Sequence, residues 1–269
     1  MKVQAAVIGH GVVGSGVVEV IMNNASTISK KLGKDMEVKR ILDLRDFEGL
    51  SYSDKFTKDF NDILNDEEIG VVAEVMGGVH PAYEFTKALL ESGKSVVSSN
   101  KALVAAKGAD LLATAKANHV NYFFEASVGG GIPVIHPLYD CMSANEIVEI
   151  AGILNGTTNF ILTKMIKDGM SFADALALAQ QLGYAERDPS ADVEGEDAAR
   201  KICIMSSIAC GKHVYPEYIS NEGITKLTLK DVAYAESWGG VIKLIGYYKK
   251  LADGKMECMV CPAFISDES

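Results

Sequence analysis

Gly9-His10-Gly11-Val12-Val13-Gly14 lies between a short apolar run, Val3–Ile8, and a segment with helical spacing of apolar residues at 12–22. The stretch has the spacing G-x-G-x-x-G. Between a strand and a helix, the first glycine makes a tight turn, the second lets the backbone approach a pyrophosphate, and the third permits close helix–strand packing. Free N–H groups and the dipole at the helix start favour an anion there. We therefore predict a dinucleotide site, with a purely structural turn as the alternative and a loop-filling role for His10. Its cofactor-binding residues are Gly9, Gly11, Val12, Val13 and Gly14.

Short apolar runs and helical patterns alternate from this turn to about residue 130. Strand candidates lie at 3–8, 37–44, 71–75, 95–98 and 120–124, helical patterns at 12–22, 81–91 and 107–118, and polar residues fill 23–35. Strands that alternate with helices of this length form right-handed βαβ units and a parallel sheet. The predicted fold class is α/β, and residues 1–130 are predicted to form a doubly wound, Rossmann-type dinucleotide-binding domain.

The pattern changes after the triple glycine Gly129-Gly130-Gly131. A helix at 133–142 and a strand at 146–154 are predicted first, then three helical stretches between residues 158 and 211, then strands at 241–248 and 255–261. Helices and strands segregated in this way indicate an α+β domain. We assign residues 131–269 to a substrate-binding, catalytic domain.

The composition is that of an ordinary globular protein, with 269 residues, 48% hydrophobic and 23% charged, which excludes a disordered chain. The 26 Lys and Arg against 36 Asp and Glu give a net charge of −10, so a nucleic-acid partner is disfavoured. No apolar stretch approaches the ~18 residues of a membrane helix, and the first is too short for a signal peptide. Cys258 and Cys261 lack a second ligand pair, so we predict reduced thiols and a cytoplasmic protein.

Cofactor preference depends on the end of the second predicted strand, which runs Leu42-Asp43-Leu44-Arg45-Asp46. An acidic residue at this place binds the ribose hydroxyls of NAD, whereas an arginine accommodates the 2′-phosphate of NADP. Asp43 is expected to point along the strand, and Arg45 is a candidate phosphate ligand. Because both occur within four positions, NAD and NADP stay open.

A helix predicted from residue 193 to residue 211 carries two charges among its apolar residues. At about 100° per residue, Asp197 and Lys201 lie in the apolar stripe, whereas Glu196 and Arg200 lie on the wet side. A surface pair with this i,i+4 spacing stabilises a helix by only ~0.2–0.5 kcal/mol. Buried charges are costly and usually have a reason, so geometry alone leaves structural and functional roles for Asp197 and Lys201 open.

More acids lie just upstream of this helix, at Glu186, Asp188 and Asp192. A cluster of acids beside an inward lysine suits a substrate that carries an ammonium group and a reacting oxygen.

Six motifs follow one another over essentially the whole chain. They are the 9–14 turn, Glu74-Val75-Met76-Gly77-Gly78, Ser98-Ser99-Asn100-Lys101, Glu125-Ala126-Ser127-Val128-Gly129-Gly130-Gly131-Ile132-Pro133, Gly152-Ile153-Leu154-Asn155-Gly156-Thr157-Thr158-Asn159 and Asp188-Pro189-Ser190-Ala191-Asp192-Val193-Glu194-Gly195-Glu196-Asp197-Ala198-Ala199-Arg200-Lys201. In this order, the chain resembles the homoserine dehydrogenase family. The last two motifs are the most specific.

The resemblance implies the reversible, NAD- or NADP-dependent reduction of aspartate 4-semialdehyde to homoserine, a step toward threonine, methionine and isoleucine. A hydride would pass between the nicotinamide and the aldehyde carbon, and the new alkoxide would need a proton. The resemblance makes Lys201 the acid that supplies this proton, Lys101 the second candidate, and Asp197 the residue that orients Lys201. It also extends the cofactor site to Gly77, Asn100 and Lys101.

The resemblance also implies a substrate site and a cation site. Glu186 and Asp192 match the family's acids that hold the substrate ammonium or hydroxyl group. The matched substrate-binding residues together are Gly156, Thr157, Tyr184, Glu186, Asp192, Asp197 and Lys201. The triple-glycine segment resembles a monovalent-cation site, for an ion such as Na⁺, and a tight crossover between domains is a compatible alternative. Its ligands would be the backbone carbonyls of Glu125, Val128, Gly130 and Ile132.

The family further implies a homodimer formed through the sheet of the second domain. The chain departs from the family in two ways, because a C-terminal regulatory domain is absent and because the chain stops before a glycine-rich segment and a closing helix. We therefore expect a fragment truncated at its C-terminus. One alternative function is a nucleotide-binding, catalytically impaired fragment of the same enzyme.

A second alternative is another amino-acid or semialdehyde dehydrogenase of similar layout. The acylating type needs a nucleophilic cysteine in a positioned loop. Cys141, Cys203 and Cys210 all fall within helical patterns, which disfavours that type.

Overall fold

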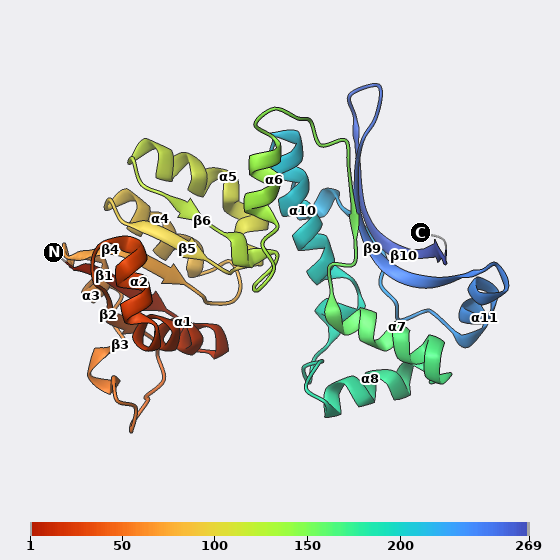
Figure 1. Ribbon diagram of the computed structural model, residues 1–269, viewed down its shortest axis with the longest axis horizontal. Helices are drawn as coiled ribbons and strands as arrows, with labels where there is room; N and C mark the ends of the chain where they lie inside the picture. The colour runs from red at the N-terminus through yellow and green to blue at the C-terminus, as the bar shows by residue number, and fades with distance from the viewer. Residues whose placement is uncertain (1, 268–269) are drawn as a thin grey trace. The chain divides into compact units, whose positions relative to one another are not determined.

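The computed structural model describes residues 2–267 of the chain, and these divide after His136 into two compact units. None of the described helices is both long and apolar enough to span a bilayer. Figure 1 labels most of the helices and strands of each unit.

The N-terminal unit is built on a six-stranded parallel sheet with the strand order β3-β2-β1-β4-β5-β6. The strands are β1 (Val3–Ile8), β2 (Met36–Leu42), β3 (Phe56–Thr57), β4 (Ile69–Glu74), β5 (Ser95–Ser98) and β6 (Tyr122–Phe123). This is the order of a dinucleotide-binding sheet, and its direction of winding reverses between β1 and β4. The prediction of a doubly wound α/β domain is confirmed.

The helices of this unit are α1 (Val12–Asn23), α2 (Ala25–Leu32), α3 (Asn61–Leu64), α4 (Ala82–Glu91) and α5 (Lys101–Ala117), with 3₁₀ turns at Ser53–Lys55 and Glu125–Ser127. Helix α2 was not predicted, because its sequence is mostly polar and the helix buries none of its residues. Helix α5 begins six residues before the predicted start, because the Asn100 side chain accepts the Leu103 N–H and so caps the first turn.

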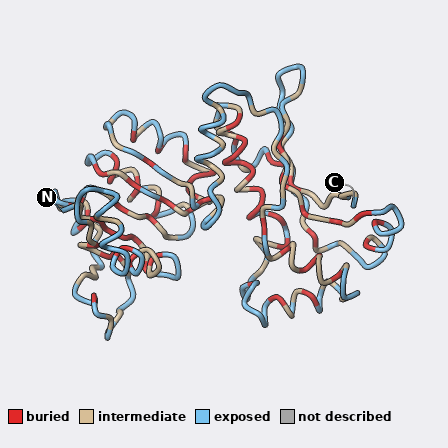
Figure 2. Tube along the Cα trace, viewed as in Figure 1, coloured by how far each residue is buried: buried red, intermediate tan, exposed pale blue. Residues whose placement is uncertain are grey.

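The core of the N-terminal unit lies between the sheet and its helices. Val7, Val38 and Ile41 of the sheet pack against Val18 and Ile21 of α1. Figure 2 shows buried residues along the strands and exposed residues along the outer faces of the helices. The sheet is therefore a rigid base from which the loops at its carboxyl edge project.

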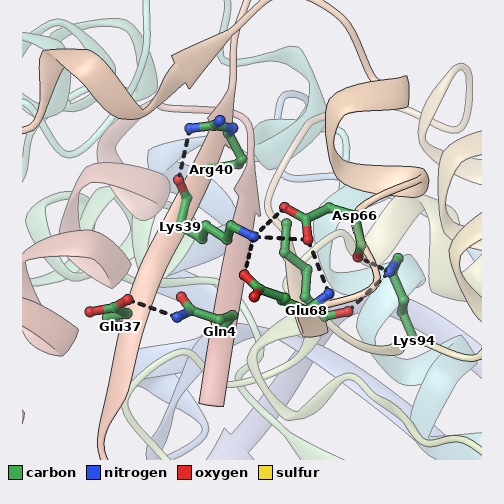
Figure 3. A network of polar contacts seen from close by, with 8 residues as sticks. Gln4, Glu37, Lys39, Arg40, Asp66, Glu68 and Lys94 are labelled. Atoms are coloured by element: carbon green, nitrogen blue, oxygen red, sulfur yellow. Dashed lines mark hydrogen bonds and ion pairs between the residues drawn. The ribbon is translucent and has the colours of Figure 1, made fainter. Parts of the chain in front are cut away.

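A polar network closes the opposite, amino edge of this sheet (Figure 3). The Lys39 Nζ of β2 lies 2.7 Å from a carboxylate oxygen of Asp66 and 2.5 Å from one of Glu68. Lys94, which is buried, donates to the carbonyls of Asp66 at 2.6 Å and Ile69 at 3.0 Å. Burial lowers the pKa of Lys94, and these carbonyl acceptors compensate for its lost hydration.

The C-terminal unit contains a four-stranded sheet with the order β7-β9-β10-β8. Strands β9 (Gly240–Lys250) and β10 (Met256–Ser266) form a long antiparallel hairpin, β7 (Glu149–Gly152) pairs antiparallel with β9, and β8 (Ser220–Asn221) pairs parallel with β10. The helices are α7 (Gly156–Asp168), α8 (Phe172–Gln181), α9 (Ser190–Val193), α10 (Glu196–Cys210) and α11 (Leu229–Ser237), with a 3₁₀ turn at Pro216–Tyr218 and α6 (Ile135–Cys141) crossing the unit boundary. The prediction of an α+β arrangement is confirmed.

Two helical features of this unit differ from the sequence prediction. The helix predicted from residue 193 is interrupted, because Gly195 has a left-handed backbone with φ +81° between α9 and α10. Only glycine adopts this conformation without strain. Helix α11 was also missed, although the Thr228 and Asp231 side chains form a capping box at its start.

Candidate functional site

The glycine turn connects β1 to α1 at the carboxyl edge of the parallel sheet. Gly9 has φ +95°, and its N–H donates to the Leu42 carbonyl of β2 at 2.9 Å. A Cβ at Gly14 would lie 1.9 Å from the Gly9 carbonyl oxygen, so α1 packs directly on the turn. A Cβ at Gly11 would meet no atom within 4 Å. The space beside Gly11 is therefore available to a ligand.

Asp43 and Arg45 lie together at the end of β2, beside this turn. The Arg45 Nε and Nη2 atoms lie 3.0 and 2.9 Å from the two Asp43 carboxylate oxygens. Asp43 also accepts the His10 N–H at 2.8 Å, and Arg45 Nη2 donates to the His10 carbonyl at 3.0 Å. The Arg45 hydrogen bonds hold the pKa of Asp43 well below its usual range. Asp43 thus ties the glycine turn to a guanidinium that remains 62% exposed.

His10 fills an aromatic pocket under the turn. Its ring lies edge-on to Phe47 at 4.6 Å and to Phe56 at 4.9 Å, and its Nε2 is 3.3 Å from the Tyr52 hydroxyl. Burial lowers the pKa of His10. Above these rings, a depression of about 450 Å³ opens beside Arg45. It is lined by Asp43, Arg45, Asp46, Phe47, Glu48, Gly49, Ser53, Phe56, Thr57 and Lys58.

Asn100 and Lys101 follow β5 at the same edge of the sheet. Lys101 is the first residue of α5, directly after the capping Asn100. The Asn100 amide donates to the Gly78 carbonyl at 2.7 Å. This bond joins the start of α5 to the loop that contains Gly77. The structure thus places the sequence-predicted cofactor residues at one edge of one sheet, on the loops and in the first turns of α1 and α5.

The segment around the triple glycine is organised by the Glu125 side chain. Its carboxylate accepts the backbone N–H groups of Val134, Ile135 and His136 at 2.6 to 2.8 Å. Burial opposes ionisation, but these donors lower the pKa of Glu125. A Cβ at Gly129 would lie 2.2 Å from the Ile132 carbonyl oxygen, so glycine is needed where the backbone folds on itself.

In the C-terminal unit, Lys201 of α10 is held from two sides. Its Nζ lies 2.9 Å from an Asp197 carboxylate oxygen, and the two side chains are only 18% and 6% exposed. The same Nζ donates to the Leu154 carbonyl at 2.9 Å. Arg200 pairs with Glu196 at 2.8 Å, with exposed fractions of 32% and 55%. The predicted difference between these two i,i+4 pairs is confirmed.

Asn155 connects the Lys201–Asp197 pair to a second acid. Its amide donates to Asp192 at 2.6 Å and to Asp197 at 3.0 Å. Its carbonyl oxygen accepts the Thr158 N–H at 2.8 Å, which caps α7. Asn155 belongs to one of the sequence motifs, but no role was predicted for it. The sequence feature that could have predicted its capping role is its position directly before a predicted helix, where asparagine is a typical N-cap residue.

The remaining substrate candidates lie near the start of α7. Gly156 is its first residue, and the Thr157 hydroxyl donates to the Tyr184 carbonyl at 2.8 Å. The Tyr184 side chain is exposed and its ring lies 5.0 Å from that of Phe160. Glu186 is exposed, and its backbone carbonyl accepts a bond from Gln180. The hydrogen bonds and the ion pair bring Asp192, Asp197 and Lys201 into one network. Glu186 precedes these residues in the sequence and does not join them through these bonds.

A parallel sheet with its winding reversal beside a glycine turn, followed by a separate α+β unit with a buried lysine–carboxylate pair, defines a two-domain protein built on a Rossmann dinucleotide-binding domain. The family described as "Homoserine dehydrogenase, NAD binding domain" matches residues 9–125, and that described as "Homoserine dehydrogenase" matches residues 133–269. The chain belongs to the homoserine dehydrogenase family.

Relatives with this name are similar along nearly the whole chain. A homoserine dehydrogenase of Bacillus subtilis is 40% identical over 276 residues, covering 98% of this chain and 62% of that protein. The crystal structure of a homoserine dehydrogenase from Thiobacillus denitrificans has a TM-score of 0.94 at 40% identity, covering 100% of this chain and 63% of that one. A hyperthermophilic archaeal homoserine dehydrogenase in complex with NADPH has a TM-score of 0.81 at 27% identity, covering 100% and 84%. The chain spans about three-fifths of the length of the curated relatives it matches.

Proposed function

We propose that the protein catalyses the NAD(P)-dependent interconversion of L-homoserine and L-aspartate 4-semialdehyde, a step of amino-acid biosynthesis. The observation that carries this proposal is the largely buried Lys201, held between Asp197 and the Leu154 carbonyl. A lysine that stabilised only the helix would sit on its wet face, as Arg200 does. A cation kept at one place by two acceptors is instead suited to meet an oxygen that gains negative charge.

In this proposal the bound nicotinamide supplies or accepts the hydride. Lys201 donates a proton to the oxygen of the reduced aldehyde carbon and takes it back in the oxidation direction. Asp197 orients the Lys201 amine, and Asn155 holds Asp197 through its amide. Lys101, at the start of α5, is the second candidate for the proton transfer.

The substrate carries an ammonium group, a carboxylate and the reacting oxygen, and the acids of the C-terminal unit suit the ammonium group. We assign Asp192 and Glu186 to it. Asp192 is already fixed by Asn155 at 2.6 Å, so it is pre-organised for binding. Gly156, Thr157 and Tyr184 are the remaining proposed contacts, since the Thr157–Tyr184 bond keeps the start of α7 against this segment.

The purified chain tests this proposal directly. NADPH fluorescence titration measures cofactor binding, and the loss of NADPH absorbance after addition of aspartate 4-semialdehyde measures turnover. We expect both binding and substrate-dependent oxidation. Binding without turnover would contradict the proposed activity and favour the alternative, a nucleotide-binding protein that is catalytically impaired.

For the cofactor we propose a preference for NADP over NAD. The Asp43 carboxylate already accepts hydrogen bonds from the Arg45 backbone and guanidinium and from the His10 N–H, so its lone pairs are largely used and ribose hydroxyls would have to displace them. The exposed face of Arg45 and the nearby Lys58 both line the depression beyond β2. Lys58 is paired with Asp46 at 2.7 Å, so the exposed Arg45 guanidinium is the cation that favours a 2′-phosphate at this place.

Arg45→Ala is expected to raise the Kd for NADPH about 10- to 100-fold, because a charge-assisted bond contributes roughly 1.5–3 kcal/mol. The Kd for NADH should change much less, since NADH lacks the 2′-phosphate. Isothermal titration calorimetry with both cofactors measures the difference. Lys30→Ala, an exposed lysine on α2, is the control for net charge. An equal loss of affinity for the two cofactors would refute the assignment.

A monovalent cation such as Na⁺ is proposed for the triple-glycine segment, bound by the backbone carbonyls of Glu125, Val128, Gly130 and Ile132. The close approach of Gly129 to the Ile132 carbonyl, which a Cβ would block, supports a folded carbonyl-lined turn. Such an ion would order this segment and take no part in the chemistry. A thermal unfolding midpoint that is the same in Na⁺ and in choline would contradict it.

We propose that the chain forms a homodimer through one face of the β9–β10 hairpin. Directly paired residues of an antiparallel sheet share a face, and the pairs Val241–Ile265, Ile245–Cys261 and Tyr247–Met259 are apolar and half-buried. The Lys243–Ala263 pair between them is also half-buried, and its lysine amine donates to Asn159. A second copy would cover this face. Sedimentation velocity that finds only a 28.8 kDa species at micromolar concentration would contradict the proposal.

We also propose a cytoplasmic location. All five cysteines are free thiols, and Cys203 is buried with a pKa that burial raises to about 12. Reduced thiols fit a reducing compartment. Recovery of the protein from a secreted or periplasmic fraction would contradict it.

A further inference from the structure

Glu74, the last residue of β4, is a fully buried carboxylate inside the N-terminal unit. Burial raises its pKa, while hydrogen bonds to the charged form oppose that shift. A carboxylate is expensive to bury, so it is kept only where its bonds are needed. No role proposed above for substrate, proton transfer or cofactor uses this residue.

Three donors converge on this carboxylate. The Ser98 hydroxyl donates at 2.5 Å, the Met76 backbone N–H at 2.9 Å and the Asn100 amide at 3.3 Å. Ser98 in turn accepts the Asn100 backbone N–H at 3.0 Å. Glu74 is therefore the shared acceptor for the segment after β4 and the segment after β5.

Both segments end at features of the proposed cofactor site. Asn100 donates to the Gly78 carbonyl and caps α5, which fixes the position at which Lys101 begins the helix. On the other side, a Cβ at Gly9 would lie 3.2 Å from the Val75 carbonyl and from the Met76 side chain, so the segment after β4 also supports the glycine turn. The buried carboxylate thus connects the segments after β4 and β5 directly, and the segment after β4 in turn packs against the glycine turn.

The strand order assigns these loops to one half of a dinucleotide. A dinucleotide binds across the reversal point of the sheet, with its pyrophosphate at the glycine turn and its adenosine ribose at the end of β2. Arg45 marks the β2 side. The other half of the cofactor, which carries the nicotinamide, then extends over β4 and β5, where Glu74, Ser98 and Asn100 lie.

We propose that Glu74 is a positioning residue for the nicotinamide half of the cofactor, acting through Met76, Ser98 and Asn100. This inference rests on the proposed dinucleotide-binding function. The carboxylate touches no cofactor atom itself. Its hydrogen bonds fix the distance between the loop at Gly77-Gly78 and the start of α5. The site for the nicotinamide is therefore pre-organised before the cofactor binds.

The test compares two ligands that share the adenosine half. NADPH contains the nicotinamide, and 2′-phospho-ADP-ribose lacks it. Glu74→Gln keeps the side-chain shape but replaces one acceptor by a donor, which leaves a donor of the network without an acceptor. We expect the Kd for NADPH, measured by calorimetry, to rise about tenfold, in line with the cost of a buried unsatisfied group. The Kd for 2′-phospho-ADP-ribose should stay unchanged.

Two further variants distinguish a selective effect on cofactor binding from a general loss of structure. Ser98→Ala removes one donor to Glu74 with a smaller change in volume, and it should shift the two Kd values in the same selective way. Thr86→Val, on α4, removes a fully buried hydroxyl from the same unit and should leave both Kd values unchanged. Thermal unfolding of each variant shows the stability lost in each case.

The outcomes are distinct. A rise in the Kd for NADPH alone, in Glu74→Gln and Ser98→Ala, supports the positioning role. Equal weakening of both ligands would show that Glu74 only stabilises the fold, and an unchanged Kd for NADPH would show that its bonds do not reach the cofactor. If the unaltered chain bound neither ligand, the proposed dinucleotide function would itself fail.

Discussion

Lys201→Ala is expected to lower the turnover of homoserine with NADP by about two orders of magnitude or more, the contribution typical of a positioned acid–base group. The Lys201 amine is held 2.9 Å from Asp197 and 2.9 Å from the Leu154 carbonyl, so alanine removes a group whose position is already set. The affinity for NADPH should stay nearly unchanged, because the glycine turn belongs to the other unit. Steady-state kinetics and fluorescence titration measure the two effects.

Arg200→Ala is the matched control for this variant. Arg200 lies next to Lys201 on the same helix but pairs with Glu196 on the exposed side. Exposed i,i+4 pairs contribute only ~0.3–0.5 kcal/mol, so both turnover and stability should be close to those of the unaltered chain. Near-normal turnover of Lys201→Ala would exclude Lys201 as the proton donor and direct attention to Lys101.

Gly11→Val is expected to abolish detectable dinucleotide binding while the protein stays folded. Gly11 has φ −82°, a conformation that valine adopts, and a Cβ there would meet no protein atom within 4 Å. The new side chain would instead occupy the space into which the backbone admits a pyrophosphate. Calorimetry with NADPH and circular dichroism measure the two expectations.

Gly14→Val separates this effect from a loss of the fold. A Cβ at Gly14 would lie 1.9 Å from the Gly9 carbonyl oxygen and 2.9 Å from its carbonyl carbon. Because both are backbone atoms, the turn or α1 must move, and a lowered unfolding midpoint is expected together with lost binding. Unchanged NADPH affinity in Gly11→Val would rule out the turn as the cofactor site.

The sequence predicted those parts of the fold that depend on neighbours along the chain. The strand–turn–helix around Gly9 and Gly14 is local, and the inward direction of Asp197 and Lys201 follows from the helical period. Helix α2 was missed because its sequence is mostly polar and it buries no residue, so its few apolar residues were assigned to a polar connection. The early start of α5 was missed because it depends on a single capping side chain, Asn100.

The candidate site was predicted less completely for a physical reason. Asn155 joins Asp192 to Asp197 across 37 and 42 positions of sequence, and Glu74 gathers donors from two separate strand ends. Such hydrogen bonds exist only after the chain has folded, and no periodicity records them. Asn155 and Glu74 both belong to motifs of the family, but a motif does not show which side chains are hydrogen-bonded to each other.

The two bonds that hold Lys201 also restrict what it can recognise. A protonated lysine has three N–H donors and no acceptor. The Leu154 carbonyl takes one donor and Asp197 takes another, each at 2.9 Å. Among residues 2–267 no further partner of this amine is found, so one donor is left, and it has a single direction. Lys201 is therefore suited to one oxygen atom, such as an aldehyde or alcohol oxygen, and poorly suited to gripping both oxygens of a carboxylate. A substrate that carries both groups would therefore bind Lys201 through its aldehyde or alcohol oxygen, because one available N–H donor can bond one oxygen atom and not both oxygens of a carboxylate.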